Sequence, residues 1–158
     1  MKNIVLIGMP SCGKTTIAKI LSEKTGRKVI DTDAEIVKKA GRSIPEIFAA
    51  EGEKGFRDKE TEVILSLWDA EDCVIACGGG AILREQNAES LKKNGIIVFI
   101  RRKTENLSCE GRPLSKDIDT LREMEKVRLP LYQKYADFSV DNNGTPEETA
   151  RKILEEIK

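Results

Sequence analysis

The chain reads Gly8-Met9-Pro10-Ser11-Cys12-Gly13-Lys14-Thr15 near its N-terminus, which fits the pattern G-x-x-x-x-G-K-[ST]. An apolar, β-branched run at 3–7 precedes it, as expected of a strand buried on both faces. Residues 16–25 then carry apolar side chains at helical spacing, and Gly26 follows as a helix terminator. Strand, glycine loop and helix in this order predict a phosphate-binding loop (P-loop). A chance loop before a helix is the weaker alternative.

The residue types of this loop suit a bound polyphosphate. Gly8 and Gly13 let the backbone turn so that successive N–H groups face an anion, and the helix N-terminus adds partial positive charge. Lys14 can reach the outer phosphates, and the Thr15 hydroxyl can ligate Mg²⁺. We expect the nucleotide to be held by Ser11, Cys12, Gly13, Lys14, Thr15 and Thr16.

Length and charge set the broad class of the protein. Its 158 residues suffice for one domain, expected to span residues 1–158, and 27 Lys and Arg balance 27 Asp and Glu. This balance argues against a nucleic-acid partner, and no apolar stretch approaches membrane-spanning length. The chain enters a strand at once, without a signal-peptide pattern. We therefore expect a cytoplasmic monomer that binds neither nucleic acid nor membrane.

Cysteine and histidine usage narrows the chemistry. The four cysteines lack metal-ligand spacing, and the chain has no histidine. We expect reduced thiols at Cys12, Cys73, Cys77 and Cys109, as in a cytoplasm. The absence of histidine excludes Ser-His-Asp and Cys-His catalysis. Phosphoryl transfer fits, because positioning and charge do most of its work.

Acidic residues follow the second predicted strand, 27–31, at the edge where ligands collect on a parallel sheet. Asp31 and Asp33 stand there on either side of Thr32. Capping of the helix predicted at 34–40 is an alternative role for Asp33, although it would not account for Asp31.

A capping box at 43–46 opens a short helix, which Gly52 breaks before a longer helix at 53–67. Arg57 and Glu60 are three residues apart and therefore neighbours on that helix. An exposed pair would contribute little, whereas in a partly buried pair Glu60 would fix the Arg57 guanidinium for a ligand. The spacing leaves both interpretations open.

An apolar strand at 73–76 runs into Gly78-Gly79-Gly80, and close approach of backbone to a ligand explains three consecutive glycines better than a plain turn. A helix at 81–94, stopped by Gly95, and an apolar strand at 96–100 should follow.

The polar stretch 104–119 contains Arg112 and has little periodicity, which predicts a mobile lid at about 108–119. A helix should resume near residue 120, followed by a strand at 138–141 and a closing helix from 145. The inward residues of the helix that resumes near residue 120 should be Leu121, Met124, Val127 and Leu131. Alternating strands and helices predict an α/β fold, a three-layer α/β/α sandwich with about five parallel strands.

Taken in order, these motifs resemble those of the shikimate kinases, a P-loop family similar to the nucleoside-monophosphate kinases. The resemblance covers about residues 4–154 and rests on the P-loop, the Asp31/Asp33 pair, Arg57 with Glu60, the three glycines, and two later motifs. These are Gly111-Arg112-Pro113-Leu114 and Arg128 with Pro130-Leu131-Tyr132.

The resemblance implies transfer of the ATP γ-phosphate to the 3-hydroxyl of shikimate. It implies catalytic roles for Lys14, Asp33 and Arg112, with Arg112 also contacting the nucleotide phosphates, and it implies that Thr15 and Asp31 hold Mg²⁺. The shikimate-binding residues would be Asp33, Arg57, Gly79, Gly80 and Arg128. A guanidinium binds a carboxylate through two parallel hydrogen bonds, so Arg57 and Arg128 suit an acidic substrate.

Three positions depart from the family pattern. The lid is short and lacks a further basic residue before Arg112, and 142–144 stands where many relatives place an arginine against the adenine. Gly55 replaces a helix former, which should loosen its helix by roughly 1 kcal/mol relative to alanine.

Three other functions stay open: a small hydroxy-acid kinase of the same fold such as a gluconate kinase, a non-catalytic nucleotide-binding domain, and a GTP switch protein. This chain lacks the N-K-x-D guanine motif that a GTP switch protein would carry.

Overall fold

A five-stranded parallel sheet forms the centre of the computed structural model, which describes residues 2–10, 12–103 and 118–157. The strand order is β2-β3-β1-β4-β5. The bounds are β1 Asn3–Ile7, β2 Lys28–Asp31, β3 Cys73–Ala76, β4 Gly95–Arg101 and β5 Phe138–Asp141. The prediction of an α/β fold with about five parallel strands is confirmed.

The central strand explains the apolar run before the P-loop. All residues of β1 are buried, and Ile4 pairs with Val74 of β3 on one side and Ile96 of β4 on the other. A strand with paired neighbours and helices on both faces has no solvent-facing side, so apolar residues occupy successive positions.

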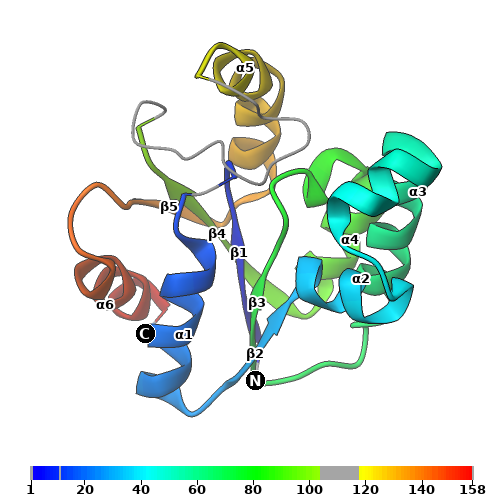
Figure 1. The fold of residues 1–158 in the computed structure, drawn as a ribbon. Coiled ribbons are helices and arrows are strands. Elements are labelled where there is room, and N and C mark those ends of the chain that lie inside the picture. Colours follow the sequence, from blue (N-terminus) through cyan, green and yellow to red (C-terminus); the bar gives the residue numbers. More distant parts are fainter. Residues whose placement is uncertain (1, 11, 104–117, 158) are drawn as a thin grey trace.

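Helices cover both faces of this sheet, with α1 and α6 on one side and α2, α3 and α4 on the other (Figure 1). The bounds are α1 Lys14–Thr25, α2 Thr32–Ala40, α3 Ile44–Leu65, α4 Glu85–Lys93, α5 Ile118–Tyr135 and α6 Pro146–Ile157, with a 3₁₀ turn, η1, at Ala81–Leu83. None of the described helices is both long and apolar enough to cross a membrane.

The helix boundaries follow their local signals. Gly26 ends α1 and Gly41 ends α2 with φ of 75° and 68°, values that favour glycine. Ser43 and Glu46 form the predicted capping box at the start of α3. Gly52 interrupts α3 with φ 73° and ψ −176°, as the sequence predicts.

The single helix expected at 81–94 is wrong. The backbone of Arg84, with φ −97° and ψ 125°, separates η1 from α4. Gly95 does not stop α4 either, because it is the first residue of β4, where an added Cβ would lie 2.7 Å from the Leu91 carbonyl oxygen and the Val5 side chain.

The expected inward face of α5 is also partly wrong. Val127 is 65% exposed, whereas Arg128 and Tyr132 are buried. The apolar spacing misled because the buried positions of this helix include a charged residue.

Gly55 has a packing reason that helix propensity does not reveal. The interruption at Gly52 brings the preceding turn close, so that a Cβ on Gly55 would clash with the Cβ of Glu51. Alanine would therefore not stabilise α3 here. The lid expected at 108–119 falls mostly outside the described residues, which resume with α5.

Candidate active site

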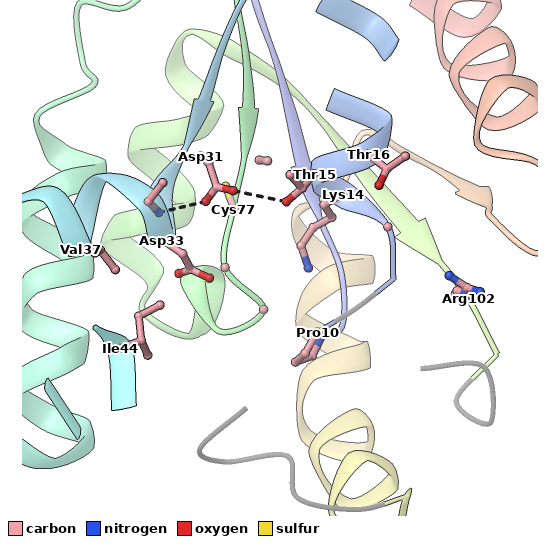
Figure 2. Close-up of a pocket in the computed structure, with 15 residues that line it drawn as sticks. Pro10, Lys14, Thr15, Thr16, Asp31, Asp33, Val37, Ile44, Cys77 and Arg102 are labelled. Carbon is pink, nitrogen blue, oxygen red and sulfur yellow. Dashed lines mark hydrogen bonds between the residues drawn. The ribbon is translucent and has the colours of Figure 1, made fainter. Parts of the chain in front are cut away.

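A cavity of about 730 Å³ opens at the carboxyl ends of the strands (Figure 2). Segments that follow β1, β2, β3 and β4 all contribute to it. The described lining residues are Pro10, Gly13, Lys14, Thr15, Thr16, Asp31, Asp33, Ala34, Val37, Ile44, Ala76, Cys77, Gly78, Gly79 and Arg102. The P-loop and the acidic pair thus share one space, as parallel-sheet topology predicts.

The P-loop presents Lys14 to this cavity at the first turn of α1. Gly13 precedes the helix with φ 103°, a left-handed conformation. The Lys14 ammonium is buried and donates to the carbonyl oxygens of Gly8 at 2.6 Å and Met9 at 3.0 Å. Ser11 lies outside the described residues.

The loop between β5 and α6 braces the P-loop. The Asn142 amide nitrogen donates to the Cys12 carbonyl oxygen at 2.8 Å, and its oxygen accepts from the Thr149 hydroxyl at 2.8 Å. Asn142 is buried, and a Cβ on Gly13 would clash with its amide. The contact fixes the peptide group that joins Cys12 to Gly13.

Thr15 and Asp31 meet on the nucleotide side of the cavity. The Thr15 hydroxyl donates to one Asp31 carboxylate oxygen at 3.3 Å, and the other oxygen accepts from the Ala34 amide at 3.2 Å (Figure 2). Asp31, and not Asp33, therefore caps α2, which corrects the expected alternative role of Asp33.

This hydroxyl and carboxylate fit Mg²⁺, an ion that takes one or two protein oxygens and completes its shell with water and phosphate. No cluster of three or more His, Cys, Asp or Glu residues that could hold a metal occurs in the described part of the chain. The pair would need a nucleotide to complete the site.

Asp33 faces the cavity from the first turn of α2, across from Lys14 (Figure 2). A Cβ on Gly78 would lie 2.6 Å from an Asp33 carboxylate oxygen. The Gly78 amide donates to the buried Thr32 hydroxyl at 3.0 Å. Thr32, which lies between the two acidic residues, thereby connects α2 to the three glycines.

Arg57 and Glu60 form a buried ion pair in α3. The Arg57 guanidinium donates to Glu60 at 2.9 Å, and the side chains are 10% and 1% exposed. Burial raises the pKa of the Glu60 carboxyl, and the charge of Arg57 opposes that shift. The exposed-pair alternative is therefore wrong.

The three glycines leave room for these side chains. A Cβ on Gly80 would lie 2.5 Å from the Arg57 guanidinium nitrogens, and one on Gly79 would lie 2.9 Å from Pro10 and 3.1 Å from an Arg128 nitrogen. None of the three glycines is among the residues with positive φ. Space, and not an unusual backbone conformation, requires glycine here.

Arg57 and Arg128 are both buried, yet neither is among the described residues that line the cavity. Arg57 lies against Gly80 and Arg128 lies against Gly79, beside the wall that Gly78 and Gly79 form. The Tyr132 hydroxyl donates to the Gly79 carbonyl at 2.6 Å, which fixes α5 to this wall. Burial raises the pKa of the Tyr132 phenol, so it stays a donor at neutral pH.

Comparison with known proteins identifies the family. A family model described as shikimate kinase matches residues 10–158. The chain belongs to the shikimate kinase family. A shikimate kinase of Thermodesulfovibrio yellowstonii is 43% identical over 100% of this chain and 96% of its own length, and one of Caldicellulosiruptor bescii is 40% identical over 98% and 94%.

Solved structures of the shikimate kinase family share the fold. A shikimate kinase from Acinetobacter baumannii, solved in complex with shikimate, is 39% identical, with a TM-score of 0.94 over 99% of this chain and 93% of its own. The enzyme from Aquifex aeolicus gives a TM-score of 0.88 at 32% identity over 98% and 95%. Membership makes the chain an ATP-dependent kinase of a small molecule.

Sequence reasoning assigned no role to three residues of this site. Asn142 and Tyr132 hold the P-loop and Gly79 through single hydrogen bonds, and no local pattern signals such contacts. Arg102 lines the cavity, and only its place in the short basic run 101–103 distinguishes it in the sequence. Arg112 lies outside the described residues, as does Cys109, whereas Cys12, Cys73 and Cys77 are free thiols as expected.

Proposed function

We propose that the protein transfers the γ-phosphate of ATP to the 3-hydroxyl of shikimate, and that residues 1–158 act as one domain. The observation that carries the proposal is a single cavity with Lys14 and Thr15 on one side and Asp33 on the other, with Gly79 also in its lining. A phosphate donor and an acceptor held at these two sides would meet between them.

On the nucleotide side, the P-loop residues Ser11 to Thr16 bind the phosphates, and Lys14 exchanges its carbonyl partners for β/γ oxygens. Negative charge that develops on the transferred group is offset by the Lys14 ammonium. Thr15 and Asp31 would hold Mg²⁺, which when bound neutralises phosphate oxygens. Arg112 remains an expected further phosphate contact.

On the acceptor side, Arg57 and Arg128 grip the shikimate carboxylate, and Gly79 and Gly80 contact the substrate through backbone. Arg57 already pairs with the buried Glu60, and a substrate carboxylate would supply a further anion beside the two buried arginines. Asp33 orients the ring hydroxyls and accepts the proton of the attacking one. The protein is expected to work as a cytoplasmic monomer without nucleic acid or membrane.

The test is ADP release from ATP with shikimate, gluconate or no acceptor. We expect release that depends on shikimate and requires Mg²⁺, with product phosphorylated at the 3-hydroxyl by NMR. ADP release with gluconate alone, or equal release without acceptor, would contradict the proposal.

A further inference from the structure

Arg102 stands at the junction of two cavities. It follows the last residue of β4 and lines the main cavity together with the P-loop residues Gly13 to Thr16. It also lines a second cavity of about 360 Å³, whose other walls include Met9, Phe99 and Leu129. Figure 2 draws Arg102 and Asp33 on opposite sides of Lys14. Arg102 is thus placed on the nucleotide side.

The Arg102 guanidinium lacks partners within residues 2–10, 12–103 and 118–157. Its Nε is buried without a hydrogen bond, and the guanidinium forms no ion pair with a described residue. The neighbouring Arg101 differs, because its Nε lies 3.9 Å from an Asp141 carboxylate oxygen and its side chain is half-exposed. A buried donor left unpaired costs free energy, so an anion beside Arg102 would be favoured.

The charges around the main cavity point the same way. Its described lining contains two carboxylates, Asp31 and Asp33, and two cations, Lys14 and Arg102. Lys14 already donates to two backbone carbonyl oxygens. A nucleotide polyphosphate brings several negative charges to this space. Lys14 would have to give up its carbonyl partners to bind them, whereas Arg102 has no partner among the described residues to give up.

We propose that Arg102 binds a phosphate group of the nucleotide beside the P-loop. The inference rests on the proposed function only in taking a nucleoside triphosphate as the donor. A planar guanidinium can donate two parallel hydrogen bonds to phosphate oxygens, which adds orientation to charge. Arg102 thereby supplies a cationic contact from β4, outside the P-loop motif.

Calorimetric titration with Mg²⁺ and an ATP analogue that carries an imido bridge between its β- and γ-phosphates tests the proposal. Arg102→Ala should raise the Kd of the analogue at least about 10-fold, the effect of a lost charged hydrogen bond. Arg102→Lys should recover part of the loss because it keeps the charge. The matched control, Arg101→Ala, should stay within about 2-fold of the parent because its partner is an exposed carboxylate. Arg102→Gln replaces Arg102→Ala if the alanine variant does not fold.

Tripolyphosphate separates a phosphate contact from a contact with the base. Its Kd, measured by competition with the analogue, should rise in Arg102→Ala by the same factor. An unchanged analogue Kd, an equal loss in Arg101→Ala, or a loss confined to the analogue would each overturn the proposal. The titrations contain no acceptor. An enzyme that prefers gluconate in the ADP assay would therefore contradict the proposed function and leave this inference standing.

Discussion

The two sides of the cavity are built in different ways. The proposed nucleotide side comes mainly from eight consecutive residues, Gly8 to Thr15, whose backbone and helix N-terminus would supply the binding groups. The proposed acceptor side gathers side chains from α2, α3 and α5 around three glycines that leave room for them. A binding surface made of backbone can be recognised from a local sequence motif, whereas one made of side chains depends on how distant elements pack.

Lys14→Met is the largest test of this contrast, because it removes the one charged side chain of the eight-residue loop Gly8 to Thr15. We expect kcat to fall by at least about 100-fold, since the ammonium offsets charge that develops on the phosphoryl group. Circular dichroism should show an intact fold. Steady-state kinetics that gave near-normal kcat in a folded variant would contradict the P-loop mechanism.

Arg57→Ala and Arg128→Ala test the side-chain-built side separately. Each should raise KM for shikimate by about 10-fold or more while KM for ATP changes little, because each removes a charged hydrogen bond to the carboxylate. Arg151→Ala serves as the control, since Arg151 is exposed and pairs with the exposed Glu155 at 3.2 Å. If shikimate KM is unchanged in both variants, neither arginine belongs to the acceptor site.

Asn142→Ala tests whether nucleotide binding also depends on a residue outside the P-loop motif. Loss of the hydrogen bond to the Cys12 carbonyl should raise KM for ATP roughly 5-fold and leave KM for shikimate unchanged. Asn143→Ala is the matched control, because Asn143 is exposed and accepts from the Lys103 amide at 3.1 Å. Equal effects of the two variants would argue against a specific brace.

Glu60→Gln should have the smallest effect, about 3-fold on KM for shikimate, because the amide keeps one acceptor for Arg57. Burial raises the pKa of Glu60 above its ordinary value of 4.5, so the folded state holds that proton more tightly than the unfolded state. Stability of the parent should therefore fall as pH rises from about 4.5 through the raised pKa.

In Glu60→Gln this part of the pH dependence should disappear, which thermal unfolding measured from pH 4.5 to 7 will check. A parallel decline in parent and variant would show that Glu60 does not titrate in this range. Unchanged shikimate KM in a destabilised variant would make Glu60 a purely structural residue.

The sequence could predict the elements whose signals are local. The P-loop, the cap at Ser43, the interruption at Gly52 and the apolar strands all follow from neighbouring residues. Val127 was misplaced because periodicity counts apolar residues, while the structure buries Arg128 beside Gly79 and exposes Val127. Helix propensity likewise could not show that Glu51 occupies the space beside Gly55. Burial of Arg57 with Glu60 also required tertiary contacts, since a spacing of three suits surface and interior alike.

The carbonyl contacts of Lys14 have a consequence for how the nucleotide is bound. A lysine side chain that is free in the unbound protein loses about 1.5–2 kcal/mol of rotamer freedom when a ligand fixes it. Here two hydrogen bonds already hold the ammonium above its own loop. The entropy cost of ordering the Lys14 side chain is therefore met on folding, and nucleotide binding only redirects a side chain that is already ordered.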